Sequence, residues 1–429
     1  MNQHNPPLSF AAKISMALAL VTCLAAACTS GNRPEDVPTV EVPVSGSGGQ
    51  PMPDEWIDED TGRRIIRLTR RPQGGSSFYF HNNPFLKGDD GTDLMVFYGN
   101  TDSLRQLFAV NLATFDISQI TRRRARLHGE IVGRSRKEVF YQCGDSVFAT
   151  HALTAESRLV FVFPENFKGR ITTLNADETL LAGTYAAPAK DSIYRKHPDK
   201  GSYFTRIYEA KIPHTLFTLN IETKELKKLH SERAWLNHVQ FSPTDPNLLM
   251  YDHEGPWHLV DRIWTIDVNT GEKHLMHERS MPMEIAGHEF FSRDGRVIWY
   301  DLQKPRGATF FLAGVNIATK EKTIYKLNRN EWSIHFNISP DQSRFAGDGG
   351  DSTQVARAKD GRWIYLFTPS GDSLVSEKLV NMKHHGYRPL EPNPHFSPDG
   401  QWIIFRSDLD GTEHVYAVSI RGENSDFRR

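Results

Sequence analysis

The strongest constraint on the fold is an internal repeat. A pattern of apolar strand, Ser-Pro-Asp-Gly-like turn and second strand recurs at a spacing of roughly 50 residues, which is typical of solenoids and propellers. Clear copies begin at His238, His288, His335 and Asn393. A variant copy begins at Thr172, and looser copies begin at His81 and His128. The chain therefore contains seven repeats.

Each copy is followed by an alternating strand that runs into an Asn/Asp-x-x-Thr turn, as in LFTLNIETKE and IWTIDVNTGE. Two hairpins per repeat make a four-stranded blade, so we expect an all-β, seven-bladed β-propeller. The last repeat supplies only three strands. The segment RRIIRLT, residues 63–69, precedes the first repeat and is expected to complete the last blade, which removes an open sheet edge.

The N-terminal region has the pattern of an export signal. An apolar run from Ile14 ends in LAAAC at Cys28, the pattern of a bacterial lipobox, although an ordinary secretory peptide cut nearby is the alternative. We expect a lipoprotein signal at residues 1–28, a flexible Pro/Gly/Ser-rich linker at 29–53 and a catalytic propeller at 54–429. The expected location is the bacterial envelope, in the periplasm or at the outer membrane, with membrane contact only through the lipid.

Charge narrows the range of partners. The chain has 51 Lys and Arg residues against 52 Asp and Glu, so no basic excess is present to bind nucleic acid. An insertion in the third repeat, from Ala186 to Lys211, is nevertheless cationic and is predicted to form a long surface loop. It is either a solvated charge run or a lip that attracts an acidic sugar chain. Its cations are Lys190, Arg195, Lys196, Lys200, Arg206 and Lys211.

Histidines recur at one repeat position. His238, His288 and His335 occupy it in consecutive repeats, and innermost strands of a propeller line its central channel. A single such histidine is usually structural, but several around one channel indicate metal binding or proton transfer. Imidazole with oxygen ligands suits divalent ions such as Mn, with Zn or Ca as alternatives. The other candidates at this position are His81, His128 and His395, with Asn393 in the seventh repeat.

A further histidine, His253, lies in the motif YDHEGPWHLVDRIW. With Glu254, Trp257 and Asp261 it is expected to form a structural hydrogen-bonded corner. A nucleophile motif and a phosphate-binding loop are both missing from the sequence.

The segment HVQFSPTDPNLLMYDHEGPWHLVDRIWTID resembles the oligogalacturonate lyases, and GHEFFSRDG and HFNISPDQSRFAGDGGD extend the resemblance. It implies a seven-bladed propeller with His238 as Brønsted base and a divalent metal, typically manganese, held by His288 and His335. A second histidine and a glutamine expected near His335 are missing, which leaves Asn337, Asn330 or His395 as substitutes. The family's carboxylate-binding arginine corresponds to Arg206 or Lys211. His81, His128 and Lys211 are the candidates for substrate contacts.

The resemblance implies β-elimination on a uronate-containing oligosaccharide or polysaccharide, which yields a 4,5-unsaturated sugar. Removal of the C5 proton places charge beside a carboxylate, so a metal or cation is needed to neutralise it. A tyrosine or water would protonate the leaving oxygen, and no particular tyrosine is indicated. Alternative substrates are other uronate glycans such as ulvan. The alternative is that the protein is a non-enzymatic, TolB-like propeller of the envelope. A scaffold of that kind would not need histidines at one repeat position of several blades. A hydrolase would need paired carboxylates that the sequence does not reveal.

Overall fold

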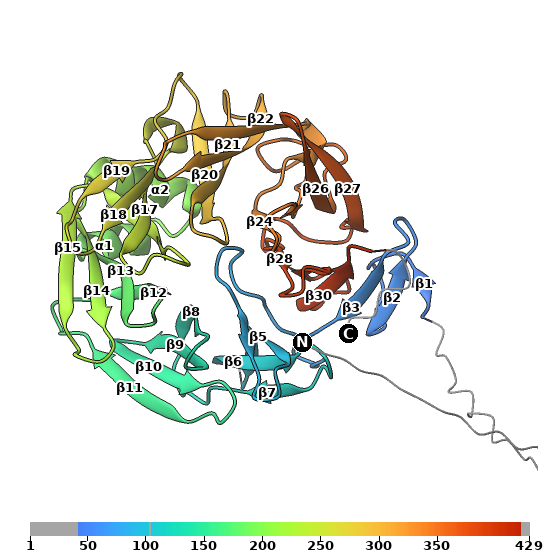
Figure 1. The fold of residues 1–429 in the computed structure, drawn as a ribbon, viewed down its shortest axis with the longest axis horizontal. Helices are drawn as coiled ribbons and strands as arrows, with labels where there is room; N and C mark the ends of the chain where they lie inside the picture. The colour runs from blue at the N-terminus through green and yellow to red at the C-terminus, as the bar shows by residue number, and fades with distance from the viewer. Residues whose placement is uncertain (1–41, 103, 422–429) are drawn as a thin grey trace, which may run out of the picture. The chain divides into compact units, whose positions relative to one another are not determined.

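The computed structural model describes residues 42–102 and 104–421, which form seven blades around a central channel (Figure 1), two of them joined edge to edge in one eight-stranded sheet. Each blade has four strands that run from the channel outward. The prediction of an all-β, seven-bladed propeller is confirmed. The expected signal segment, residues 1–28, lies outside the described residues. Within the described ranges, no helix is long and apolar enough to cross a membrane.

The first three blades follow one another along the chain and use antiparallel pairing throughout. Blade 1 contains β4 (Phe85–Lys87), β5 (Asp93–Thr101), β6 (Leu104–Asn111) and β7 (Ile117–Gln119). Blade 2 contains β8 (His128–Gly133), β9 (Glu138–Cys143), β10 (Ser146–His151) and β11 (Ser157–Val162). Blade 3 contains β12 (Arg170–Leu174), β13 (Leu180–Ala186), β14 (His214–Asn220) and β15 (Leu226–Glu232).

Blades 4 to 6 repeat the same order, and short 3-10 turns at Trp257–Leu259 and Arg329–Glu331 punctuate them. Blade 4 contains β16 (Trp235–Phe241), β17 (Leu248–Glu254), β18 (Ile263–Asp267) and β19 (Lys273–Leu275). Blade 5 contains β20 (Ile285–Phe291), β21 (Val297–Gln303), β22 (Phe310–Asn316) and β23 (Lys322–Leu327). Blade 6 contains β24 (Phe336–Ile338), β25 (Phe345–Gly347), β26 (Trp363–Ser370) and β27 (Ser373–Asn381).

Blade 7 joins the two ends of the propeller. Its inner strands are β28 (His395–Phe396), β29 (Trp402–Ser407) and β30 (His414–Ser419), and β3 (Arg64–Arg67) pairs antiparallel with β30. The predicted closure by an N-terminal strand is therefore confirmed. The sheet continues through β2 (Glu55–Asp58) to β1 (Val44–Ser45), so residues 42–53 of the expected linker include a strand. A polar segment can form it because backbone hydrogen bonds to an open sheet edge need no apolar side chains.

The repeated turn is held by its own side chains. In blade 5, Ser292 donates a hydrogen bond to Asp294 at 2.7 Å and accepts one from the Val297 N–H at 2.9 Å. Gly295 has a φ of 70°, a left-handed conformation that favours glycine. Equivalent bonds from Ser339 and Ser397 explain why the Ser-x-Asp pattern is repeated. Between blades, apolar side chains from neighbouring sheets form the core, as where Leu216 packs with Phe241 and Leu249.

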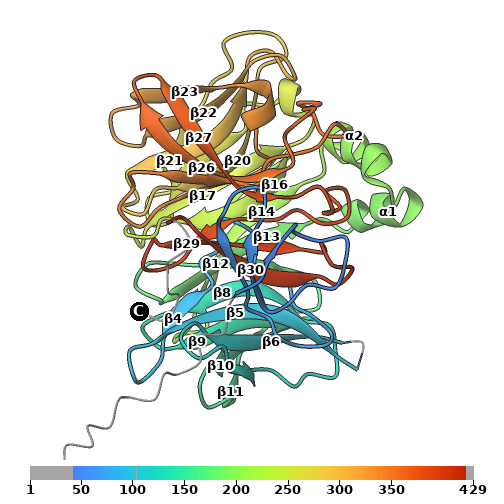
Figure 2. The ribbon, with the colours of Figure 1, turned by 90° about the vertical axis from the view of Figure 1, so that its right-hand side faces the viewer.

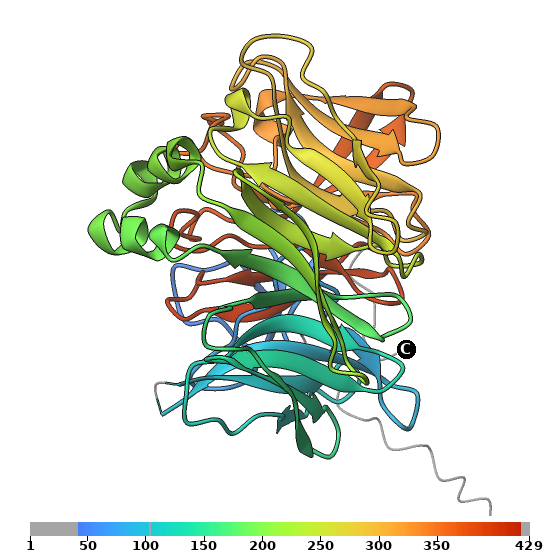
Figure 3. The ribbon, with the colours of Figure 1, turned by 90° about the vertical axis from the view of Figure 1, so that its left-hand side faces the viewer.

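The insertion in blade 3 is helical, contrary to the expected loop. It folds as α1 (Ala189–Lys196) and α2 (Lys200–Ala210), and Asp199 caps α2 by accepting bonds from two backbone N–H groups. Tyr194 and Tyr203 pack edge to face between the helices. The sequence does not reveal these helices because the segment lacks a strong apolar stripe, and in the structure only one of its residues, Ile207, is buried. Figures 2 and 3 show both helices standing out from one face of the propeller.

Candidate active site in the central channel

Two of the predicted histidines occupy β-bulges in innermost strands. In β16, Asn237 pairs with Asp252 and Gln240 with Met250, so one extra residue is accommodated around His238. In β20 the same shift occurs between Gly287 and Phe290, around His288. Both histidines have positive φ values, 42° and 53°. Bulges of this kind re-aim side chains and are frequent beside active sites, because strained backbone persists only where the surroundings hold it.

The third histidine, His335, is oriented by a carboxylate. Asp348 accepts hydrogen bonds from both the His335 backbone N–H and Nδ1, each at 2.8 Å. Because Nδ1 is then the protonated nitrogen, Nε2 carries the lone pair. Nε2 lies 3.2 Å from the Tyr79 hydroxyl and 3.7 Å from Glu391 Oε2. A carboxylate that fixes the tautomer of a histidine is the usual support of a metal ligand.

The predicted histidines do meet at one place in the channel. The ring centroids of His288 and His335 are 4.8 Å apart. Tyr79 bridges the remaining distance, with its ring centroid 5.0 Å from that of His335 and 6.1 Å from that of His238. These side chains come from blades 4, 5 and 6 and from the loop between β3 and β4. Figure 1 shows that this loop, drawn in blue, runs into the middle of the ring.

A buried charge cluster lies directly behind His238. Arg262, only 2% exposed, forms ion pairs with Asp252, Glu254 and Glu289, with Nη1 2.7 Å from Glu254 and Nε 3.0 Å from Glu289. The other Glu254 oxygen lies 3.5 Å from His238 Nε2. Three buried carboxylates thus share one guanidinium, and Glu254 also faces the His238 imidazole.

The charge cluster changes proton affinities in the channel. Burial acts to lower the pKa of His238, but Asp252 and the hydrogen bond to Glu254 raise it above its ordinary value. Burial also raises the pKa of Asp252 to about 8. By contrast, burial and the neighbouring His335 hold the pKa of His288 well below its usual range. His288 is therefore neutral at pH 7, the form that binds a metal.

Two groups of donors could hold a metal. Among the described residues, ligand atoms of His238, Asp252 and Glu254 lie within 4.8 Å of one another. Arg262 already binds both of these carboxylates, and its charge opposes a cation there. The alternative is the pair His288 and His335. His288 Nδ1 is buried, and no hydrogen-bond partner lies within its reach in residues 42–102 and 104–421.

Asn337 and His395, predicted as metal ligands, both form hydrogen bonds to the channel loop, and His395 Nδ1 has no hydrogen-bond partner among the described residues. Asn337 donates to the Phe80 carbonyl at 3.0 Å and accepts from the Phe396 N–H at 3.1 Å, so its amide is fully used. His395 Nε2 lies 3.1 Å from the Asn82 carbonyl. Asn330, the other substitute, is exposed on the 3-10 turn before His335. The sequence places Asn337 and His395 near the channel but cannot show that a loop passes between them.

His81 borders the cluster, whereas His128 lies apart from it. His81 packs at 5.0 Å from Tyr79 but lines a cavity of about 190 Å³ together with Ser242 and Ser292. Ser242 follows the C-terminal end of β16, whereas Glu254 pairs with its first residue, so this cavity belongs to the opposite mouth of the channel. His128 precedes its bulge, where Gly129 takes the positive φ. Burial and three arginines lower its pKa, namely Arg105, Arg126 and Arg170.

Arg206 and Lys211 are not brought to the histidines. Arg206 is exposed and donates to Ser202 in its own helix, and the Lys211 ammonium lies over the Tyr208 ring at 3.8 Å. Lys200, at the start of α2, is close enough for its charge to lower the pKa of His288. Lys190 is part-buried near Glu254 and Asp252, and burial lowers its pKa to about 8. The insertion therefore approaches the channel with Lys190 and Lys200 rather than with Arg206 and Lys211.

The sequence did not indicate three further residues of the cluster as functional candidates. Glu254 was assigned to a structural corner, and it does bind the Trp257 indole N–H at 3.0 Å, but its second oxygen faces His238. Tyr79 and Asp348 lie outside the repeat position that was compared. Asp348 could have been proposed as a functional residue, because it lies in the same motif as His335.

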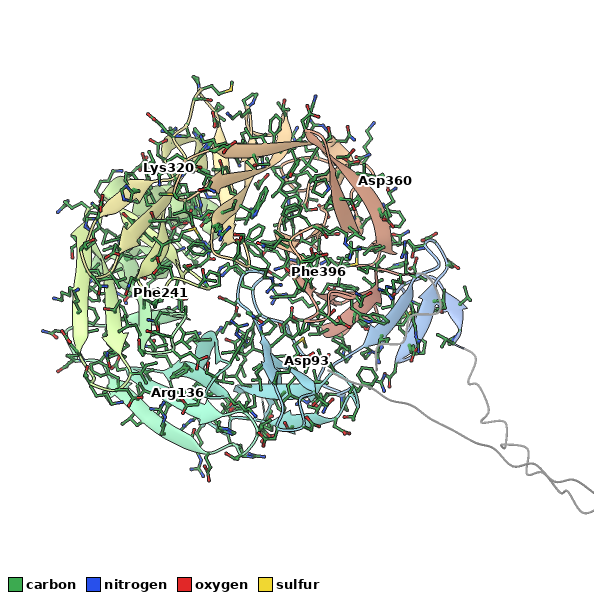
Figure 4. All side chains as sticks on the ribbon, in the orientation of Figure 1. Asp93, Arg136, Phe241, Lys320, Asp360 and Phe396 are labelled. Atoms are coloured by element: carbon green, nitrogen blue, oxygen red, sulfur yellow. The ribbon has the colours of Figure 1, made fainter. Side chains whose placement is uncertain are left out.

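Figure 4 shows side chains filling the ring, with the labelled Phe396 near its middle and Arg136, Lys320 and Asp360 toward its rim.

The fold and the site define a seven-bladed propeller with a histidine- and carboxylate-lined channel. The profile of the family described as oligogalacturonate lyase matches residues 53–423. An oligogalacturonate lyase of Dickeya dadantii (strain 3937) is 24% identical over 384 residues, which covers 85% of this chain and 95% of the relative. An oligogalacturonide lyase of Pectobacterium atrosepticum is 23% identical with the same coverage. The chain therefore belongs to the oligogalacturonate lyase family, a family of polysaccharide lyases, which excludes the scaffold alternative.

Solved structures agree on the fold. The crystal structure of an oligogalacturonate lyase from Vibrio parahaemolyticus superposes with a TM-score of 0.73 at 23% identity, covering 86% of this chain and 96% of that one. An oligogalacturonate lyase solved in complex with manganese also gives a TM-score of 0.73, at 22% identity, covering 88% of this chain and 99% of its own. These likenesses extend over the whole propeller.

Proposed function

We propose that this protein cleaves oligogalacturonide-type chains by metal-assisted β-elimination to a 4,5-unsaturated uronate. The observation that carries the proposal is the meeting of His238, His288 and His335 from three consecutive blades in one channel, with His335 tied to Asp348. The family and the acidic substrate that its name states give the class of reaction. Other uronate glycans, such as ulvan, belong in the same test.

His288 and His335 are the proposed metal ligands, with the Glu391 carboxylate 3.7 Å from His335 Nε2. The buried, unpartnered Nδ1 of His288 and the lone pair on His335 Nε2 fit a cation, and imidazole with carboxylate suits manganese. A related lyase has been solved with this ion. A bound metal supplies Lewis-acid neutralisation of the substrate carboxylate. Asp348 holds His335 so that Nε2 stays available.

His238 is the proposed base. Its side chain is 28% exposed, which leaves it open to a substrate in the channel, and its neutral form accepts the C5 proton. Glu254 lies 3.5 Å from its Nε2 and stabilises the imidazolium that forms. Proton abstraction beside a carboxylate creates additional negative charge. Lys200 and Lys190 are the proposed cations that attract the acidic chain to this mouth, in place of Arg206 and Lys211.

The test is incubation of the protein with oligogalacturonide, ulvan-type and glucuronan substrates in the presence of manganese. The expected result is growth of ultraviolet absorbance from the conjugated unsaturated uronate, on oligogalacturonide first, with loss of activity in EDTA and recovery on adding manganese. Saturated products alone, or no product from any substrate, would refute the proposal. Mass spectrometry of the products separates elimination from hydrolysis.

We also propose that the protein is exported and anchored to the bacterial envelope through a lipid on Cys28, a residue outside the described part of the chain. The lipobox pattern LAAAC supports it. Metabolic labelling with a fatty-acid analogue should mark the wild-type protein but not Cys28→Ser. Equal labelling of both proteins, or of neither, would argue against the anchor.

A further inference from the structure

The channel loop presents one hydroxyl to the histidine cluster. Tyr79 projects from this loop, with its OH 3.2 Å from His335 Nε2 and its ring beside His238 and His81. It is part-exposed, so a substrate in the channel can reach it. We propose that Tyr79 is the catalytic proton donor to the leaving O4 oxygen. This inference rests on the proposed lyase function.

The position of Tyr79 is fixed by hydrogen bonds between its loop and side chains of the surrounding blades. Glu130 of blade 2 accepts hydrogen bonds from the Tyr79 backbone N–H at 2.7 Å and from the Asn82 amide at 2.9 Å. Asn393, just before blade 7, accepts from the Phe80 N–H at 3.0 Å. These bonds hold Tyr79, Phe80 and Asn82 in place from two sides of the channel.

Asn337 of blade 6 and His395 of blade 7 complete the support, through the carbonyls of Phe80 and Asn82. Anchors from three blades thus converge on a four-residue stretch of loop. These anchors pair the backbone groups that the loop buries, and at the same time they fix its position in the channel. Support of this kind is what a catalytic group needs, because its geometry must be held before the substrate arrives. Asn337, His395, Asn393 and Glu130 are accordingly positioning residues.

The geometry matches the needs of the elimination. The C–H bond that breaks and the C–O bond that breaks lie on adjacent carbons of one sugar, so the base and the acid must both reach the same ring. His238 and Tyr79 are neighbours with ring centroids 6.1 Å apart. Tyr194 and Tyr203, on the helical lip, instead pack against each other at 4.6 Å.

The step balances without a co-reactant. His238 takes H5 as a proton, and the C5–H electron pair forms the C4=C5 double bond. The C4–O4 bond breaks with its electron pair on O4, and the Tyr79 hydroxyl supplies the proton that makes O4 an alcohol. Afterwards His238 gives its proton to water and Tyr79 takes one from water, so both groups return to their starting states.

The experiment compares two leaving groups in the manganese-loaded, full-length protein. When digalacturonate is cleaved, the departing sugar oxygen must receive a proton. The second substrate is a galacturonide that carries 4-nitrophenol at O4 and that the wild type cleaves; its leaving group, 4-nitrophenolate, departs as a stable anion. Tyr79→Phe should lose about 10²- to 10⁴-fold in kcat on digalacturonate and keep the wild-type rate on the nitrophenyl substrate. Tyr325→Phe, on the outermost strand of blade 5, is the matched control and should match the wild type on both.

Each outcome is decisive. Wild-type activity of Tyr79→Phe on digalacturonate, or an equal loss on both substrates, overturns the acid role, since an equal loss is the mark of altered binding or folding. Absence of unsaturated product from the wild type on either substrate refutes the lyase function itself. The two failures are therefore distinguishable.

Discussion

Replacing Arg262 by methionine removes the guanidinium that neutralises three buried carboxylates. Arg262 is 2% exposed, and its partners Asp252, Glu254 and Glu289 are 0%, 6% and 1% exposed. Methionine retains most of the apolar volume, so the change tests the charge rather than the packing. Water cannot reach the stranded carboxylates, which must be protonated or remain unpaired.

The expected loss is about 3–5 kcal/mol, the range for breaking a buried ion pair by removal of one partner. Glu254 and Glu289 both lose their ion-pair partner in this variant. The matched control is Arg136→Met. Arg136 is 38% exposed and its partner Glu222 is 62% exposed, so solvent screens that pair and its loss should have a much smaller effect.

The assay is urea unfolding followed by tryptophan fluorescence, with far-ultraviolet circular dichroism as a second probe of the same transition. The difference in the free energy of unfolding between Arg262→Met and the wild type should greatly exceed that of the control. Equal effects of the two substitutions, or a loss under about 1 kcal/mol for Arg262→Met, would refute the account of a buried cluster held by one guanidinium.

Two further predictions concern the site. His238 must be neutral to act as base. Burial acts to lower its pKa, but Asp252 and Glu254 raise it above 6.5. The value of kcat/KM should therefore rise with pH through a midpoint above 6.5. Glu254→Gln removes one of these negative charges and should move the midpoint to lower pH; a midpoint that stays or rises would contradict the assignment. Asp348→Asn removes the carboxylate that orients His335 and should weaken manganese binding about 10- to 100-fold, measured by electron paramagnetic resonance of free Mn²⁺ without reference to activity. Unchanged affinity would separate His335 from the metal.

The fold could be predicted because the repeat carries its own local chemistry. Ser292 and Asp294 close their turn with bonds between neighbours in the sequence, so the pattern is visible without tertiary information. The closing strand was also predictable, since the last repeat supplies only three strands and residues 63–69 precede the first repeat. The helices of the insertion were missed because they bury a single residue, Ile207, and so lack the apolar periodicity that identifies a helix.

The candidate site was only partly predictable. Alignment on the turn placed His238, His288 and His335 at one repeat position, and the bulges at that position direct two of them into the channel. Alignment cannot show what fills a channel. Tyr79 precedes the first repeat, which begins at His81, so the repeat pattern could not reveal it. The sequence also could not show that the Asn337 amide binds the loop that carries Tyr79.

The most direct test of the central claim is the initial rate at which wild-type protein and His238→Ala form unsaturated product from oligogalacturonide with manganese present. The account predicts product from the wild type and a rate about 10²- to 10⁴-fold lower from a variant that folds normally, because the group that removes the C5 proton is gone. A variant as fast as the wild type would mean that the channel histidines do not perform the chemistry.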